Sequence, residues 1–163
     1  MKRLANALCT LVVILCATEA GMSAEPRATE PRDEISIRNV LKGFAEAWNK
    51  HDAEAFSMAF AEDADFTNVR GMSAHGRSDV ARFHAPIFAS IFKDSSLKID
   101  DVRIRFIKPD VAAVDEWWEM TGARDQNGQE IPLRRGLLNL VMTKHDALWA
   151  IAVMHNMDLP VSP

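Results

Sequence analysis

The stretch from Arg134 to Asp158 reads RRGLLNLVMTKHDALWAIAVMHNMD and predicts a β-hairpin. Its two halves carry apolar side chains at every second position, and a polar turn over residues 144–147 separates them. Period-two alternation that ends in turn residues is typical of strands. The alternating residues are Leu138, Leu140 and Met142 in the first half and Trp149, Ile151 and Val153 in the second. Because the faces between them are also largely apolar, we expect the hairpin to lie centrally in a sheet that helices cover.

One end of this hairpin carries polar side chains. Period-two spacing puts Asn156 on the same face as the small residues Ala150 and Ala152, which leave room for something to approach closely. Arg134 and Arg135 stand at the corresponding end of the other strand. A basic pair beside an amide at one mouth of a sheet indicates a ligand site.

Residues 1–24 have the features of a secretory signal peptide. A positive start at residues 1–3 precedes an apolar run over residues 4–17, and small residues follow, with cleavage expected after Ala24 or Ala20. The alternative is an uncleaved anchor, but the apolar run is shorter than the roughly 18 to 20 residues that span a bilayer. We therefore expect a periplasmic or secreted protein that has no membrane attachment after cleavage.

Cleavage changes the charge and the cysteine content of the chain. Losing Lys2, Arg3 and Glu19 takes the net charge from −4 to −5, and both cysteines leave with the signal peptide. The mature chain then has no disulfide, no thiolate nucleophile and no cysteine metal ligand. An acidic balance without a basic run argues against nucleic acid as a partner. The length that remains suits one domain.

Helical patterns come first in the mature chain. After a polar linker at 25–32, a helix starts near Pro31 with an apolar stripe over Ile37, Val40, Leu41, Phe44 and Trp48. A short second helix, capped by Asp52, is expected to carry Phe56, Ala59 and Phe60. A third helix is expected with Ser78 as its N-cap, and its apolar face includes His84. This face leaves two alternatives for His84, a core imidazole bonded to a backbone carbonyl and a functional group.

Strand patterns dominate the rest of the chain. We expect strands over 65–70, 97–107 and 111–121 in addition to the hairpin. In the strand at 111–121, Glu116 and Trp118 share one face and Trp117 lies on the other. The order of elements includes no parallel crossover, which predicts an α+β fold with a curved antiparallel sheet.

Three stretches resemble a known family. They are AWNKHDAEAFSMAFAEDADFTNVRG at 47–71, the strand RRGLLNLV and the closing LWAIAVMHNMD. Over residues 33–159 the chain resembles the SnoaL-like branch of the nuclear transport factor 2-like superfamily, and more narrowly the SgcJ/EcaC group. The resemblance implies a cone-shaped sheet around a long helix with a pocket at its open end. Many members are homodimers joined through the outer sheet surface, and the superfamily hosts several enzyme classes as well as non-catalytic domains.

The resemblance also implies which residues form the pocket. Carried over by position, they are Trp48, Phe60, Phe66, Asn68, His84, Trp118, Arg134 and Asn156. The pattern of residues alone indicates His84 and Asn156 as well.

No cofactor or metal is expected. The chain has no tyrosine for a steroid-isomerase-like oxyanion hole and no Gly-x-Gly-x-x-Gly dinucleotide fingerprint. Its five histidines are scattered, whereas a zinc site needs three or four converging ligands.

Two functions remain open. In the first, the domain binds a small, largely apolar ligand and carries out cyclase- or isomerase-type acid–base catalysis. His84 then serves as acid or base and Glu116 as a second titrating group with a raised pKa, while Arg134 and Asn156 hold a developing oxyanion. In the second, the chain is a non-catalytic dimeric ligand-binding or assembly module. If His84 and Glu116 converge on one cavity, the catalytic function is favoured. If each is instead paired with the backbone, the non-catalytic function is favoured.

A homodimer is expected in either case. Trp117 alternates with Trp118, so one of the two indoles must face away from the inside of the sheet. A large aromatic on the outer face beside Val141 and Val153 indicates an interface through the convex side of the sheet.

Overall fold

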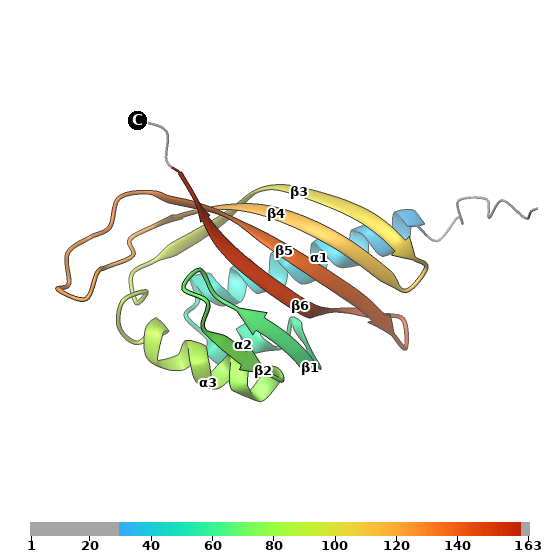
Figure 1. Cartoon of the computed structure of the whole chain (residues 1–163), viewed down its shortest axis with the longest axis horizontal. Coiled ribbons are helices and arrows are strands. Elements are labelled where there is room, and N and C mark those ends of the chain that lie inside the picture. Colours follow the sequence, from blue (N-terminus) through green and yellow to red (C-terminus); the bar gives the residue numbers. More distant parts are fainter. Residues whose placement is uncertain (1–29, 161–163) are drawn as a thin grey trace, which may run out of the picture.

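A strongly curved sheet of six strands wraps around a long helix, as Figure 1 shows. The helices are α1 (Glu30–Asn49), α2 (Ala53–Ser57) and α3 (Arg77–Phe88). The strands are β1 (Phe60–Thr67), β2 (Ser73–His75), β3 (Ser96–Lys108), β4 (Val111–Thr121), β5 (Arg134–His145) and β6 (Leu148–Leu159). Their order across the sheet is β2-β1-β6-β5-β4-β3. The expected α+β class, with a cone-like sheet around N-terminal helices, is confirmed.

The computed structural model describes residues 30–160. The expected signal peptide at 1–24 and most of the expected linker at 25–32 lie outside the described residues. Helix α1 begins at Glu30, so the last part of that linker is helical. Within the described range, no helix has the length and apolar character that crossing a bilayer requires.

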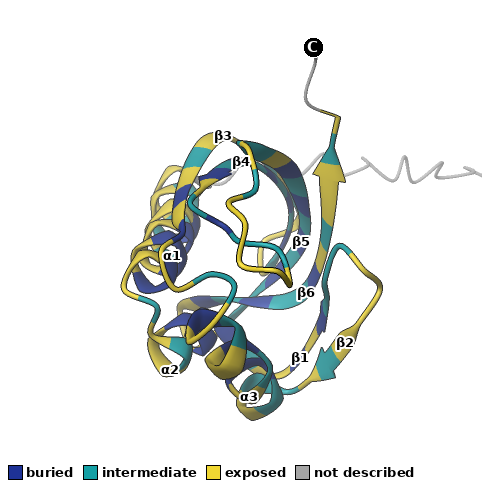
Figure 2. Ribbon diagram, turned by 90° about the vertical axis from the view of Figure 1, so that its left-hand side faces the viewer, coloured by how far each residue is buried: buried dark blue, intermediate teal, exposed yellow. Residues whose placement is uncertain are grey.

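Helix α1 buries the stripe that its sequence predicts. Ile37, Leu41, Phe44 and Trp48 are each less than a tenth exposed, because spacings of three and four residues return to the same side of a helix. Figure 2 shows the sheet curling so that β3 lies near α1 while β1 lies near α3. Asp33 ties the start of α1 to the hairpin, accepting hydrogen bonds from Lys144 Nζ and Trp149 Nε1.

The predicted hairpin is confirmed as strands β5 and β6 in the middle of the sheet. The turn is tighter than expected, since only Asp146 and Ala147 lie between the strands, both with positive φ. Two central residues with positive φ are typical of a turn that matches the twist of a hairpin.

A β-bulge in β6 corrects the expected facing of its residues. Val141 pairs with Val153 but Met142 pairs with Ile151, so Ala152 is an extra residue in β6. The alternation therefore shifts by one position, and the buried residues are Trp149 and Ile151 before the bulge and Met154 after it. The prediction that Ala150 and Ala152 share a face with Asn156 is wrong for this reason.

The expectation of a purely antiparallel sheet is also wrong. Strand β1 pairs with β6 in parallel, while the four other strand pairs are antiparallel. Strand β1 begins at Phe60, which was expected on the second helix, and that helix ends earlier at Ser57. Edge strand β2 lies in a stretch where no strand was expected. These boundaries depend on pairing with β6, a strand about 90 residues away in sequence. Local sequence patterns do not predict such pairing.

Two helix caps were predicted with different success. Asp52 caps α2 as expected, its Oδ1 accepting a hydrogen bond from the backbone N of Ala55 at 2.9 Å. Helix α3 starts at Arg77 after Gly76, whose φ is 79°, so Ser78 lies inside the helix and is not its cap as expected. Glycine reaches positive φ without strain, so it can turn the chain from β2 directly into the helix.

Candidate ligand-binding cavity

A cavity of about 600 Å³ lies at the open end of the curved sheet, between its inner face and the helices. This volume falls within the range of small-molecule pockets. Its apolar wall includes Phe44, Trp48, Phe56, Phe66, Phe83, Ile87, Phe92, Trp118, Met120, Leu138 and Met154. Its polar and charged lining consists of Asn68, His84, Asn156, Asp158 and the arginines Arg70, Arg124, Arg134 and Arg135. The site is therefore an aromatic cavity with a polar rim.

His84 is a buried, neutral imidazole on the cavity wall. It is 2% exposed, and its Nδ1 lies 2.8 Å from the backbone oxygen of Val80, one helical turn earlier. Because that oxygen only accepts, Nδ1 carries the proton and Nε2 is left with an unshared electron pair. Burial lowers the pKa of His84 to about 4, against the smaller raising effect of the Val80 carbonyl. At neutral pH His84 thus offers a hydrogen-bond acceptor.

Asn156 offers donors instead. The indole Nε1 of Trp118 donates to Asn156 Oδ1 at 3.1 Å, which determines the orientation of the amide. The two N–H bonds of Asn156 Nδ2 have no acceptor among residues 30–160. Trp118 in turn lies against Gly136, where a Cβ atom would be 2.0 Å from its ring.

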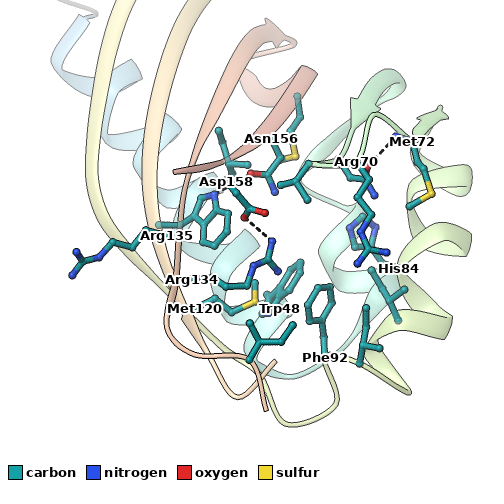
Figure 3. A pocket seen from close by; sticks show the side chains of 18 of the residues that line it. Trp48, Arg70, Met72, His84, Phe92, Met120, Arg134, Arg135, Asn156 and Asp158 are labelled. Atoms are coloured by element: carbon teal, nitrogen blue, oxygen red, sulfur yellow. Dashed lines mark hydrogen bonds and ion pairs between the residues drawn. The ribbon is translucent and has the colours of Figure 1, made fainter. Parts of the chain in front are cut away.

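Arg134 lies beside this pair. Its guanidinium is 5.5 Å from the centre of the Trp118 ring and donates through Nη2 to Asp158 at 2.6 Å. The side chain is 18% exposed, and the other guanidinium N–H groups make no hydrogen bond to the described residues. Figure 3 shows Arg134, Asn156 and Asp158 on one side of the cavity and His84 on the other.

Glu116 does not join His84 in this cavity. It is fully buried on the inner face of β4, and neither carboxylate oxygen has a hydrogen-bond partner among the described residues. Burial raises its pKa to about 8. Its pairing partner Leu138 and its strand neighbour Trp118 line the cavity, but Glu116 is not among the lining residues. The two titrating groups therefore do not converge on one empty volume.

The other predicted site residues divide between wall, core and loop. Trp48 and Phe66 line the cavity, and Trp48 Nε1 donates to Ser95 Oγ at 3.0 Å. Phe60 is fully buried in the core and does not line the cavity. Asn68 lines the cavity, but its Oδ1 accepts from the backbone N atoms of Arg70 and Met72 and so holds the loop between β1 and β2.

Several lining residues were not expected from the sequence. They are chiefly Arg70, Met72, Phe83, Phe92 and Arg124. Arg70 precedes Gly71, and an asparagine two positions earlier is a turn signal that marks a loop at the rim. The aromatic residues have no comparable signal, because an aromatic side chain on a helix suits a core equally well.

The described residues contain no group of three or more His, Cys, Asp or Glu side chains arranged to hold a metal ion. His75 pairs with Asp65 on the surface, which raises the pKa of His75, first through their hydrogen bond. This pair lies outside the cavity lining.

A bent sheet wrapped around a helix, with an aromatic cavity at its open end, is the fold that similar solved structures describe as cystatin-like or nuclear transport factor 2-like. Residues 41–146 match the model of the SnoaL-like domain, and the chain belongs to that family. Membership of the narrower SgcJ/EcaC group stays a prediction.

Solved structures support the fold. A cystatin-like protein from Caulobacter vibrioides is 23% identical, with a TM-score of 0.73 over 79% of this chain and 91% of that one. A domain from Nostoc punctiforme is 27% identical, with a TM-score of 0.66 over 80% of this chain and 79% of that one. LinA is 12% identical, with a TM-score of 0.74 over 82% and 90%. Comparison with curated proteins found no match.

Proposed function

We propose that this SnoaL-like domain binds a small, largely apolar molecule that carries a hydrogen-bond acceptor at one end and a donor at the other. The observation that carries the proposal is the hydrogen-bonding capacity left on the cavity wall. Nδ1 of His84 donates a hydrogen bond to the backbone oxygen of Val80, so Nε2 remains free to accept one. Oδ1 of Asn156 accepts a hydrogen bond from Trp118, so Nδ2 remains free to donate. A ligand with a carbonyl near Asn156 and Arg134 and a hydroxyl near His84 complements this wall.

Desolvation supports the same conclusion. A ligand that fills the cavity covers these polar groups, and covering a polar group without giving it a hydrogen-bond partner costs about 1 to 3 kcal/mol, so a ligand with matching groups is favoured. The aromatic wall favours a flat or cyclic apolar body, since rings pack well against Phe56, Phe66 and Trp118.

Acid–base catalysis of the isomerase or cyclase type is a second proposal, favoured by the neutral His84 facing two donors across the cavity. His84 Nε2 takes a proton from a carbon next to the ligand carbonyl, and Asn156 and Arg134 stabilise the enolate oxygen. A pKa of about 4 makes His84 a weak base, and Glu116 lies outside the cavity. Both facts favour the non-catalytic binding module over this second function.

Two matched probes test the binding proposal. Naphthol donates a hydrogen bond and acetonaphthone accepts one on the same ring system. We expect His84→Phe, which keeps an aromatic ring but removes Nε2, to weaken naphthol binding about fivefold by calorimetry. We expect Asn156→Asp, which keeps the acceptor for Trp118 but removes the donor, to weaken acetonaphthone instead.

Each variant is the control for the other. Melting temperatures near the wild-type value show that each change acts on binding and not on folding. Equal binding of both probes to all three proteins, or a large loss of stability with unchanged binding, contradicts the proposed roles of His84 and Asn156.

Proton abstraction has its own test. In D₂O, the wild-type protein should speed deuterium incorporation into the methyl group of acetonaphthone, followed by NMR, and His84→Phe should abolish the effect. Incorporation at the rate of free solution leaves the non-catalytic module as the function.

We also propose that the domain acts as a homodimer joined through the convex face of the sheet. Trp117 is half-buried on that face, with the Arg103 guanidinium 5.4 Å from its ring centre, and Val141 and Val153 are half-buried nearby on β5 and β6. Trp117→Glu places a charge there and should convert dimers to monomers in sedimentation experiments. An unchanged mass, or a wild-type protein that is already monomeric, rejects the dimer.

Export remains part of the proposal, since the signal features of residues 1–24 motivate it. N-terminal sequencing of the native protein should find a chain that starts near Glu25. An intact start on a cytoplasmic product contradicts export.

A further inference from the structure

The four arginines that line the cavity differ in whether a carboxylate neutralises them. The pairs are Arg124 with Asp94 at 3.1 Å, Arg134 with Asp158 at 2.6 Å and Arg135 with Glu119 at 2.9 Å. Arg70 makes no ion pair and no side-chain hydrogen bond within residues 30–160. Asp158, which Arg134 engages, is the single carboxylate of the lining. The rim therefore carries one guanidinium group that forms no ion pair with a carboxylate of the described residues.

Arg70 belongs to a loop that is held in place. Asn68 Oδ1 accepts from the backbone N atoms of Arg70 and Met72, both at 2.9 Å. The backbone of Asn68 adds two more hydrogen bonds, to Met72 and to Gly71, and Gly71 has a φ of 75° that glycine adopts without strain. An arginine on a fixed loop loses less freedom when it binds a ligand than one on a loose loop.

The position of Arg70 relates it to the cavity. In Figure 3 its side chain extends from the loop toward the side of the cavity where His84 lies. The rest of that wall is largely apolar, so an anion at the rim faces a low-dielectric surface where a single positive charge attracts it more strongly than in bulk water. The chain as a whole is acidic, with a net charge of −4, so attraction for an anion at this site comes from the local charge of Arg70 and not from the overall charge of the protein.

We infer that Arg70 binds the anionic head group of the ligand, which makes the ligand an amphiphilic acid with an apolar body inside the cavity and a carboxylate or similar group at the rim. This inference rests on the proposed binding function and adds the charge of the ligand to it. Guanidinium suits a carboxylate because its N–H groups form two parallel hydrogen bonds with the two oxygens. Asn68 is a positioning residue in this arrangement, since it acts through the loop.

Two fluorescent probes with one ring system test the role of Arg70. Anilinonaphthalene sulfonate carries a negative charge, and N-phenylnaphthylamine has the same aromatic body without it. We expect Arg70→Gln to weaken binding of the sulfonate about tenfold and to leave the neutral probe unchanged, because only the charged hydrogen bonds are lost. Added salt should weaken sulfonate binding to the wild type more than to Arg70→Gln.

The matched control is Arg105→Gln. Arg105 is exposed on edge strand β3 and lies outside the cavity lining, so its removal changes the net charge equally without touching the rim. Asn68→Ala should weaken the sulfonate as well, and by less than Arg70→Gln, because the arginine is still present on a looser loop.

The outcomes separate this inference from the binding function itself. If the wild type binds both probes and Arg70→Gln binds them equally well, the assignment of Arg70 is wrong while the cavity stands. Equal losses for both probes also overturn it, since they show an effect on the shape of the cavity. A wild-type protein that binds neither probe contradicts the proposed binding function, and the inference fails with it.

Discussion

Replacing Glu116 by glutamine is expected to raise the free energy of unfolding by about 3 kcal/mol at pH 7. Burial raises the pKa of this carboxyl from 4.5 to about 8 in the folded protein, so folding at pH 7 requires that Glu116 take up a proton. Each pKa unit between 4.5 and the working pH costs about 1.4 kcal/mol. Glutamine has nearly the same shape and no proton to take up, so this cost disappears.

The pH dependence identifies the cause. Since the folded pKa lies above the unfolded one, the folded state binds the extra proton, and the Glu116 contribution to stability falls as pH rises from 4.5 to about 8. The advantage of Glu116→Gln should therefore be near zero below about pH 4.5 and largest above about pH 8. Chemical denaturation at several pH values measures it. Titration of His84 is common to both proteins and cancels in the difference.

The matched control is Glu119→Gln on the same strand. Glu119 pairs with Arg135 at the surface, and surface ion pairs contribute about 1 kcal/mol or less. We expect little change in stability at any pH. If Glu116→Gln is destabilising at pH 7, or if its effect does not grow with pH, Glu116 is not a buried, protonated acid in the folded protein.

Gly136→Ala is expected to lower the free energy of unfolding by about 3 kcal/mol, the upper part of the range for overpacking a core. The new Cβ would lie 2.0 Å from the Trp118 ring and 2.6 Å from the backbone oxygen of Met157, so both the indole and strand β6 must move. The hydrogen bond from Trp118 to Asn156 is lost when the indole shifts. We therefore expect a melting temperature about 10 °C lower and weaker binding of acetonaphthone.

Two further variants isolate this effect. Gly43→Ala on α1 has nothing within 4 Å of the new Cβ and should stabilise the protein slightly, because alanine favours a helix more than glycine does. Adding Trp118→Leu to Gly136→Ala should restore part of the stability by removing one of the two clashes. A Gly136→Ala protein that melts like the wild type would mean that the indole does not lie against this glycine.

The helices were predictable where one face of an element is buried along its length. The stripe of α1 and the buried positions Val80 and His84 of α3 follow from spacing alone, because a helix that packs on one side must repeat its apolar residues with the helical period. The central hairpin was predictable for a similar reason, with a period of two. Element ends were less predictable, as the early end of α2 before Phe60 shows, because they depend on which strand pairs with which.

In the candidate site too, some residues could be predicted from local patterns and others depended on contacts between elements. His84 stood out as a titratable residue within an apolar stripe, and Asn156 as a polar residue at the end of an apolar strand. Glu116 was equally prominent in the pattern, yet it lies in the core behind the cavity wall. The alternation along a strand shows which residues share a face. It does not show how far the cavity extends along the cone, because that depends on the packing of other elements.

The amino-acid sequence by itself determined the α+β class, the central hairpin, the placing of Trp117 and Trp118 on opposite faces of β4 and the place of His84 on an apolar helix face, because each follows from the period of residues within one element. Only the tertiary structure decided the parallel pairing of β1 with β6, the bulge at Ala152, the separation of Glu116 from the cavity and the unpaired charge of Arg70 at the rim. Each of these depends on contacts between segments far apart in the chain. Such contacts are chosen by the total free energy of packing, to which no local pattern corresponds.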